Sequence, residues 1–200
     1  MAVGTVDAIV FYKAREEDKE FFQELKQQDK KRLEEIGVDL TDYGEPGIYT
    51  VLIERGKTPY KEMLATAGGH IENGESPTEA AVRELEEETG IQTKHLETVT
   101  KAEENLELVF DPRYDPEDKL PEDEPEEIYL IDGLEDKDGE DFHYYTAVFD
   151  YQPENPDRRN FQLKGETDAE QSFWVPLQEL PNMAFTQHRI VEWGRKQYEK

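Results

Sequence analysis

Short apolar runs and longer polar stretches alternate along the chain. Residues 3–12, 48–54 and 142–151 are rich in β-branched and aromatic side chains, which is typical of buried strands. Further predicted strands are residues 91–100, residues 106–110 and the short segment 173–175. The pattern therefore predicts a sheet whose strands are separated by helical and polar segments.

Helical periodicity appears between these predicted strands. The segment 14–36 consists of charged helix formers with one thin apolar stripe, made of Phe22, Leu25, Leu33 and Ile36. Asp29 interrupts this stripe, so we expect a helix that lies on the surface of the molecule, inserted between two strands. A solvated arm and a partner-binding helix are both compatible with the pattern. Residues 186–198 are predicted to form another helix.

The predicted elements interleave without a regular repeat. This favours an α/β fold with a mixed sheet covered by helices over a doubly wound parallel sheet. The 200 residues correspond to one domain, residues 1–200. Residues 115–127 contain eight acids, three prolines and one lysine, and such a composition predicts a solvated loop.

Charge and composition narrow the classes of partner. The 23 Lys and Arg residues face 49 Asp and Glu, a net charge of −26, which disfavours nucleic acid and anionic membranes as partners. No apolar run reaches the roughly 18 residues of a membrane span, and the absence of cysteine excludes disulfide and thiolate chemistry. Ten Tyr, nine Phe and two Trp residues indicate a folded core although only 35% of residues are hydrophobic. We expect an acidic, cytoplasmic protein.

The segment 69–91, GHIENGESPTEAAVRELEEETGI, carries the candidate chemistry. Its helix is predicted to start after Ser76, with proline in the first turn and a capping box closed by Glu79. Gly90 is placed to end the helix in a left-handed turn. At about 100° per residue, the predicted buried face consists of Ala81, Val82, Leu85 and Thr89.

Three acidic side chains share one side of this helix. Glu84, Glu87 and Glu88 stand at positions i, i+3 and i+4, so their carboxylates lie on one arc beside the buried face. A hard divalent cation would relieve their mutual repulsion, and an oxygen-only ligand set favours Mg²⁺ or Mn²⁺ over zinc. Arg83 lies four residues before Glu87 and can pair with it, which offsets part of the repulsion.

The spacing of nine residues distinguishes this cluster from an ordinary solvated helix face. The chain contains 33 glutamates, so composition alone would explain three neighbouring ones. Other residue types, however, recur with them at fixed intervals: Gly69, Glu75, Arg83-Glu84-Leu85, Glu87-Glu88 and Gly90-Ile91. A chance match at all nine positions has a probability on the order of one in a million.

This spacing resembles the complete signature of the Nudix hydrolases, Gly-x5-Glu-x7-Arg-Glu-U-x-Glu-Glu-x-Gly-U, in which U is aliphatic. The resemblance implies a Nudix-type α/β/α sandwich with a mixed sheet and one catalytic loop–helix–loop. It also implies metal-dependent hydrolysis of a nucleoside diphosphate linked to another group, with metal ions that neutralise the phosphates and activate the attacking water. The implied metal ligands are Glu84, Glu87, Glu88 and the backbone carbonyl of Gly68. Arg83 would orient the glutamates, and Glu75 would brace the loop.

The wider resemblance is to the ADP-ribose pyrophosphatase branch of that family. The matching segments are residues 6–11, 51–55 and 168–188. The resemblance covers most of the chain except residues 14–46 and about 112–140, which look like insertions. Ala67-Gly68-Gly69 replaces the usual Pro-Gly-Gly at the entrance of the substrate cleft. An ADP-ribose-like substrate is favoured, and a nucleoside triphosphate or another nucleotide sugar is the alternative.

Weaker candidates lie outside the signature. By resemblance, Glu166 or Glu170 in a late loop would supply the general base or a further metal ligand, and each is also explained as a surface acid. Arg55 at a strand end and His188 on the last helix are candidate substrate contacts. A solvated arginine and a structural histidine are the alternative interpretations. The resemblance further implies a homodimer.

A function of another class stands beside the enzyme. An acidic docking or cation-binding protein with a vestigial site would share this composition. The intact signature speaks against it, and so does the lack of a repeated calcium-loop pattern. Phosphate release from a panel of nucleoside diphosphate compounds, after phosphatase coupling, separates the two hypotheses.

Overall fold

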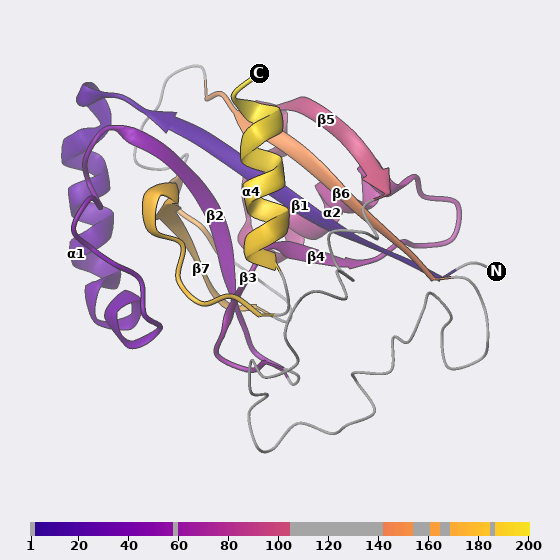
Figure 1. Cartoon of the computed structure of the whole chain (residues 1–200), viewed down its shortest axis with the longest axis horizontal. Helices are drawn as coiled ribbons and strands as arrows, with labels where there is room; N and C mark the ends of the chain where they lie inside the picture. The colour runs from indigo at the N-terminus through magenta and orange to yellow at the C-terminus, as the bar shows by residue number, and fades with distance from the viewer. Residues whose placement is uncertain (1–2, 58–59, 105–141, 154–160, 165–168, 185–186) are drawn as a thin grey trace.

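A computed structural model describes residues 3–57, 60–104, 142–153, 161–164, 169–184 and 187–200 (Figure 1). The predicted strand 106–110, the predicted loop 115–127, the expected insertion 112–140 and Glu166 lie outside these residues. Among the residues that the structure describes, no helix is both long and apolar enough to cross a membrane.

The central strand of the sheet is β1 (Val3–Ala14), which the first apolar run of the sequence forms. The middle of this strand is buried. β1 pairs antiparallel with β2 (Gly47–Arg55) and β4 (Ala67–His70), and parallel with β6 (Phe142–Tyr151). These pairings bring segments from both halves of the chain to one strand (Figure 1).

Three further described strands complete a mixed sheet. β5 (Leu96–Glu104) pairs antiparallel with β6, and both β3 (Leu64–Ala65) and β7 (Ala169–Pro176) pair antiparallel with β2. The predicted mixed sheet is confirmed, and β7 is longer than the predicted segment 173–175. β3 and β4 escape sequence analysis because two and four residues are too few to show an alternating pattern.

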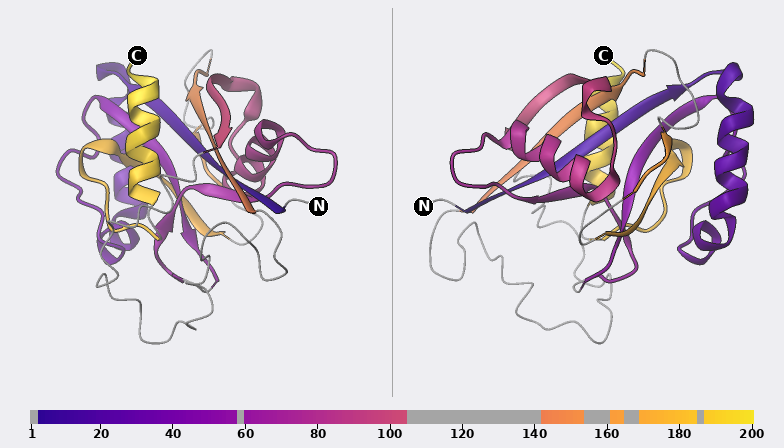
Figure 2. Two further views of the ribbon diagram at one scale, coloured as in Figure 1. Left: turned by 45° about the vertical axis from the view of Figure 1, so that its right-hand side comes forward. Right: turned by 180° about the vertical axis from the view of Figure 1, so that it is seen from behind.

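Helices cover both faces of the sheet. α2 (Pro77–Thr89) lies on one face against β4 and β1, and α4 (Gln187–Tyr198) lies on the other face against β6 and β1 (Figure 2). α1 (Lys19–Glu35) lies at one end of the molecule, beyond β2 and β7 (Figures 1 and 2). This layering is the α/β/α sandwich that the sequence predicts.

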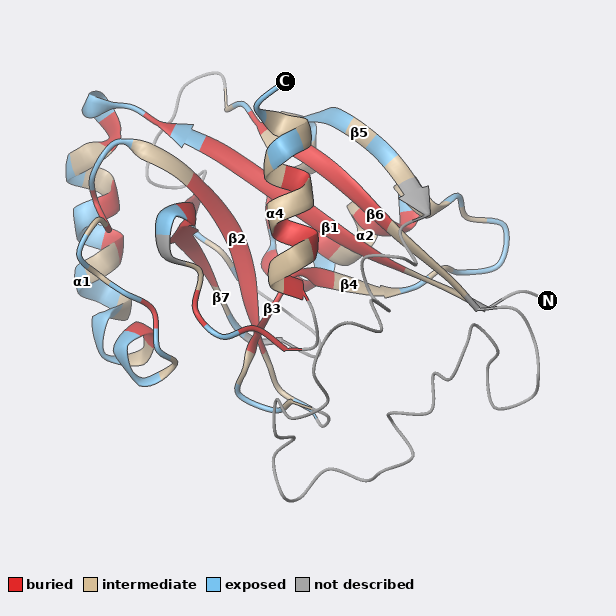
Figure 3. Ribbon diagram, viewed as in Figure 1, coloured by how far each residue is buried: buried red, intermediate tan, exposed pale blue. Residues whose placement is uncertain are grey.

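The helix α1 packs on the core through its apolar stripe. Phe22, Leu25 and Leu33 are buried, and the Phe22 ring stacks on Tyr49 of β2 with ring centroids 4.1 Å apart. Much of the outer side of α1 is exposed (Figure 3). Because its stripe belongs to the same core as the sheet, α1 is not a free solvated arm.

The start of the predicted helix 14–36 needs correction. β1 continues to Ala14, and a 3₁₀ turn, Glu16–Asp18, precedes α1. The Asp18 carboxylate accepts hydrogen bonds from the Arg15 N–H at 2.8 Å and from the Tyr12 hydroxyl at 2.9 Å. These two bonds stabilise a turn where the sequence pattern favours helix.

The predicted strand 91–100 also begins later than expected, at Leu96. Gly90 is left-handed, with φ of 67°, and Thr93–His95 form a 3₁₀ turn after it. Ile91 is a single buried side chain of the core, and its N–H donates to a hydroxyl at the end of α2. A buried residue in a turn looks like the first residue of a strand when only hydrophobicity is considered.

Candidate functional site

The signature helix has the predicted caps but a different buried face. Glu79 donates its N–H to the Ser76 hydroxyl at 3.3 Å, and its carboxylate accepts the Ser76 N–H at 2.9 Å. The capping box is therefore confirmed, as is the left-handed glycine that ends α2. Val82 is only half-buried, whereas Ala80 and Glu88 are buried. The core side of α2 thus includes one of the three glutamates.

Arg83 contacts several acidic side chains around α2. Its Nε and one terminal nitrogen donate to the two Glu75 oxygens, both at 3.0 Å. Its other terminal nitrogen contacts Glu84 at 2.8 Å and Glu87 at 3.4 Å. Arg83 also donates to the His70 carbonyl at 2.9 Å, so it joins the helix to β4 and the loop. The hydrogen bonds between Arg83 and Glu75 raise the pKa of the arginine and lower that of the glutamate.

Two carboxylates occupy the places where Gly68 and Gly69 lack a side chain. An ideal Cβ on Gly69 would lie 2.6 Å from Glu84 Cδ, and an ideal Cβ on Gly68 would lie 2.6 Å from Asp7 Oδ1. The position on Gly68 also faces the carbonyl oxygen of Val6. Glycine at both positions lets the two carboxylates lie directly against the backbone of β4.

Glu88 is the buried glutamate, with 6% of its surface exposed. Its Oε2 accepts the Gly68 N–H at 2.9 Å, which joins α2 directly to β4. Burial raises the pKa of Glu88 to about 8, and the charges of Glu84 and Asp7 add to this increase. The Gly68 hydrogen bond and the Arg55 charge act in the opposite direction. A nearby cation would favour the charged carboxylate, which burial disfavours.

Asp7 of β1 is a residue of the site that the sequence analysis missed. It is 5% exposed, and burial raises its pKa to about 7 against the opposing effects of Tyr144 and Arg55. The Tyr144 hydroxyl donates to Asp7 Oδ2, and Gln187 Nε2 lies 3.4 Å from Asp7 Oδ1. The signal that could have revealed it is a charged residue within the apolar run 3–12.

The remaining sequence candidates are Arg55, His188, Glu170 and Glu166. Arg55, at the end of β2, is close enough to lower the pKa of both buried carboxylates, so the fold brings it to the site. His188 is half-buried on α4, directly after Gln187. Glu170 belongs to β7, and Glu166 lies outside the described residues.

The acidic side chains do not converge on a single point as they stand. Within the described part of the chain, no three histidine, aspartate or glutamate side chains surround a common metal position. Glu84 and Glu87 contact Arg83, and Glu88 contacts the Gly68 N–H. The donor set nevertheless fits a hard divalent cation, because it consists of oxygens on one side of one helix and includes a buried carboxylate beside other negative charges.

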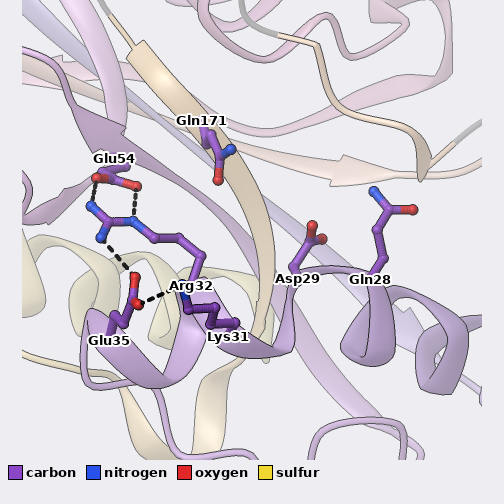
Figure 4. Close-up of a pocket in the computed structure, with 7 residues that line it drawn as sticks. All are labelled: Gln28, Asp29, Lys31, Arg32, Glu35, Glu54 and Gln171. Carbon is purple, nitrogen blue, oxygen red and sulfur yellow. Dashed lines mark hydrogen bonds and ion pairs between the residues drawn. The ribbon is translucent and has the colours of Figure 1, made fainter.

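A second arginine–glutamate cluster lies between α1, which carries Arg32 and Glu35, and β2, which carries Glu54 (Figure 4). Arg32 Nε donates to Glu54 Oε2 at 2.9 Å, and one terminal nitrogen of Arg32 donates to the other Glu54 oxygen. The second terminal nitrogen donates to Glu35 Oε2 at 3.2 Å. Glu54, on β2, is only 1% exposed. The three side chains line a pocket of about 390 Å³ together with Gln28, Asp29, Lys31 and Gln171. This pocket shares none of its lining residues with the cluster around Arg83.

The fold and the site define an α/β/α domain whose acidic loop–helix–loop packs on a strand containing two glycines. The chain belongs to the Nudix family, because the NUDIX domain matches residues 36–194. The resemblance inferred from the signature is thereby confirmed, and so is the predicted fold class.

Known proteins of this kind include an ADP-ribose pyrophosphatase of Methanocaldococcus jannaschii, 28% identical over 142 residues. The match covers 71% of this chain and 63% of that protein, so the chain spans less than two thirds of this curated relative. The NUDIX domain of Shewanella oneidensis NrtR, complexed with ADP ribose, has a TM-score of 0.53 and 14% identity, over 99% of this chain and 89% of that one. A bifunctional NMN adenylyltransferase/ADP ribose pyrophosphatase of Francisella tularensis, complexed with AMP and manganese, has a TM-score of 0.55 and 16% identity, over 98% and 42%. At these identities, the structural likeness shows the fold alone.

Proposed function

We propose that this protein hydrolyses the diphosphate bond of a nucleoside diphosphate linked to another group, with an ADP-ribose-like compound as the favoured substrate. The observation that carries the proposal is the meeting of Glu84 and Glu88 at the glycine pair of β4, beside Arg83. The family and the pyrophosphatase relative support it. Further support comes from the neighbours whose own complexes contain ADP ribose, or AMP with manganese.

Mg²⁺ or Mn²⁺ is the proposed cofactor. Glu84, Glu87, Glu88 and the Gly68 carbonyl would hold it. A bound divalent cation supplies positive charge for the diphosphate and makes water more acidic. Positive charge is needed because the chain itself carries a net charge of −26, which repels an anionic substrate.

The side chains around the cation site would orient its ligands and contact the substrate. Arg83 sets the direction of Glu84 and Glu87. Glu75 holds the loop, because it accepts the Glu72 N–H at 3.0 Å in addition to both bonds from Arg83. The helix α2 and the strand β4 keep their relative position through two hydrogen bonds, from Arg83 to the His70 carbonyl and from the Gly68 N–H to Glu88.

The remaining roles are assigned to the four candidates outside the signature. Arg55 supplies positive charge beside the buried carboxylates, and we assign it to a substrate phosphate. His188 is assigned to a substrate contact from α4. On the family resemblance, Glu170 or Glu166 is the proposed general base or a further cation ligand.

A substrate panel tests the proposal. The purified protein is incubated with ADP-ribose, other nucleotide sugars and nucleoside triphosphates in Mg²⁺, Mn²⁺ or EDTA. Products are separated by chromatography, because EDTA also inhibits a coupling phosphatase. We expect turnover of ADP-ribose with either cation and none with EDTA. Turnover of only the triphosphates or the other nucleotide sugars would favour those substrates, and no turnover of any compound would favour an acidic docking protein.

A matched pair of variants assigns the activity to the site. Glu88→Gln removes the charge of the buried glutamate, whereas Glu86→Gln removes an exposed charge from the same helix. We expect Glu88→Gln to abolish most of the turnover and Glu86→Gln to retain it. Equal activity of the two variants would contradict the assignment.

The oligomeric state and the location are separate proposals that rest on resemblance and composition. We expect a cytoplasmic homodimer. Light scattering tests the oligomeric state, because a homodimer has twice the chain mass of 23.3 kDa. A mass of one chain would contradict it.

A further inference from the structure

Asp7 is a buried carboxylate that the proposed ligand set does not use. It lies on the central strand β1, opposite Gly68 of β4 on one side and opposite Thr146 of β6 on the other. Burying a carboxylate is costly unless donors compensate for the lost hydration. The donors that surround Asp7 therefore indicate what holds it there.

Two side chains from distant parts of the chain meet Asp7. The Tyr144 hydroxyl on β6 donates to Oδ2, and the Gln187 amide at the start of α4 lies 3.4 Å from Oδ1 and 3.5 Å from Oδ2. The other end of the Gln187 side chain, Oε1, accepts the Thr66 N–H at 2.7 Å, just before β4. Asp7, Tyr144 and Gln187 thus connect β1, β6 and α4 with the start of the glycine strand.

The same carboxylate lies against a proposed cation ligand. Asp7 Oδ1 would be 2.6 Å from an ideal Cβ on Gly68, so it packs directly on that residue. The Gly68 N–H in turn donates to Glu88 at 2.9 Å. A shift of Asp7 therefore moves Gly68, and through Gly68 it moves the Glu88 carboxylate.

We propose that Asp7, Tyr144 and Gln187 form a positioning network that fixes Gly68 and Glu88 for the cation. This inference rests on the proposed function, because it assumes that a cation binds at Gly68 and Glu88. None of the three side chains is assigned to the cation or the substrate. They act through the backbone of β4, and α4 takes part in the site through Gln187 even though it covers the opposite face of the sheet from α2 (Figure 2).

A pair of neighbouring tyrosines provides the test. Tyr144→Phe removes the hydroxyl that donates to Asp7. Tyr145→Phe removes a hydroxyl from the next residue of β6, which faces the other side of the strand. Mn²⁺ binding is measured by the EPR signal of the free ion without substrate, and kcat, KM and the Tm in EDTA are recorded for each variant.

We expect Tyr144→Phe to weaken Mn²⁺ binding by about tenfold or more, as removal of a partner behind a ligand does. Its kcat should fall while KM changes little. Tyr145→Phe should match the parent protein in Mn²⁺ binding, kcat, KM and Tm. Asp7→Asn should weaken Mn²⁺ binding similarly, and combining it with Tyr144→Phe should add little, because both changes break one network.

The outcomes separate this inference from the proposed function. Equal Mn²⁺ binding by Tyr144→Phe and Tyr145→Phe would overturn the network, even if the parent protein hydrolyses ADP-ribose. A lower Tm of Tyr144→Phe with unchanged Mn²⁺ binding would also overturn it, because that is a purely structural effect. Mn²⁺ binding that depends on Tyr144, without turnover of any substrate, would refute the proposed hydrolysis and keep the network. A parent protein that binds no Mn²⁺ would refute both.

Discussion

Two arginines of this protein each contact glutamates, and the two clusters differ in how charge is balanced. Under α1, Arg32 binds both oxygens of the buried Glu54. On α2, Arg83 is shared among Glu75, Glu84 and Glu87. In the first cluster Arg32 also contacts the exposed Glu35, which has a second cation in Lys31 at 3.5 Å. The second cluster leaves three acids around one arginine.

This contrast distinguishes a structural ion pair from a cluster that is short of positive charge. A buried carboxylate that has its own arginine needs no further cation. On α2, in contrast, burial raises the pKa of Glu88 to about 8, and the charge of Glu84 adds to this increase. The second cluster holds more acids than arginines, which supports the proposal that a cation from solution completes it. We make four predictions about the two clusters, in decreasing order of the free-energy change that we expect.

Neutralising Glu84 should affect activity most. We expect Glu84→Gln to lower kcat/KM for ADP-ribose by about a thousandfold, equivalent to about 4 kcal/mol, because a ligand charge is lost. Steady-state kinetics at saturating Mg²⁺ measures the effect. Glu34→Gln on α1, which removes an exposed charge paired with Lys30, is the control. A Glu84→Gln enzyme within tenfold of this control would show that the cluster on α2 is structural.

Removing Arg32 should cost stability and leave turnover unchanged. We expect Arg32→Ala to lower the free energy of unfolding by about 2–3 kcal/mol, because it leaves Glu54 buried without a partner. Denaturant titration measures the loss. In the double variant Arg32→Leu with Glu54→Leu, most of the stability should return, since replacing both charges is nearly neutral. A large loss of kcat in Arg32→Ala would instead connect α1 to the site.

Alanine substitutions at the two glycines of β4 should separate an effect on Mn²⁺ binding from an effect on thermal stability. An alanine at Gly69 meets the end of the flexible Glu84 side chain, which can move, whereas an alanine at Gly68 meets the backbone of Val6. We therefore expect Gly69→Ala to weaken Mn²⁺ binding by about tenfold, or about 1.4 kcal/mol, with little change in Tm. Gly68→Ala should lower the Tm clearly. Calorimetric titration with Mn²⁺ and thermal unfolding in EDTA provide the two readouts.

The smallest expected effect is a gain in stability. In EDTA at neutral pH, Glu88→Gln should unfold with a free energy about 1 kcal/mol higher than the parent protein, because a buried carboxyl group among other acids is replaced by a neutral amide. Saturating Mn²⁺ should stabilise the parent protein and not the variant. Glu54→Gln, at the balanced cluster, should be less stable than the parent protein in both buffers. If Glu88→Gln is less stable than the parent protein in EDTA, the idea of an excess of negative charge around Arg83 is contradicted.

The parts of the site that sequence analysis predicts are those encoded within one helix. The cap at Ser76, the end at Gly90 and the shared side of the glutamates follow from residues at most four positions apart, where helical geometry is fixed. The burial of Glu88 was not predicted, because it depends on which side of α2 faces β4. The resemblance to the family supplied Glu166 and Glu170. Arg55 and His188 were candidates because of their places at a strand end and on the last helix.

The parts that escaped prediction depend on contacts between distant residues. Asp7 lies 137 positions from Tyr144 and 180 from Gln187. No local pattern can show that these side chains meet, because the contact depends on the register of β1 with β6 and on the packing of α4. The two glycines were visible in the sequence, but their partners Asp7 and Glu84 were not.

The position of β1 in the middle of the sheet has a consequence for biosynthesis. This strand is translated before the other described strands, and its parallel neighbour β6 is translated much later. Until then one edge of β1 has no partner, and an apolar strand with an open edge is prone to association with other nascent chains. We therefore expect chaperones to stay bound to β1 until β6 has been translated. The glutamates of α2 are also translated long before Tyr144 and Gln187, the residues proposed to position Gly68 and Glu88.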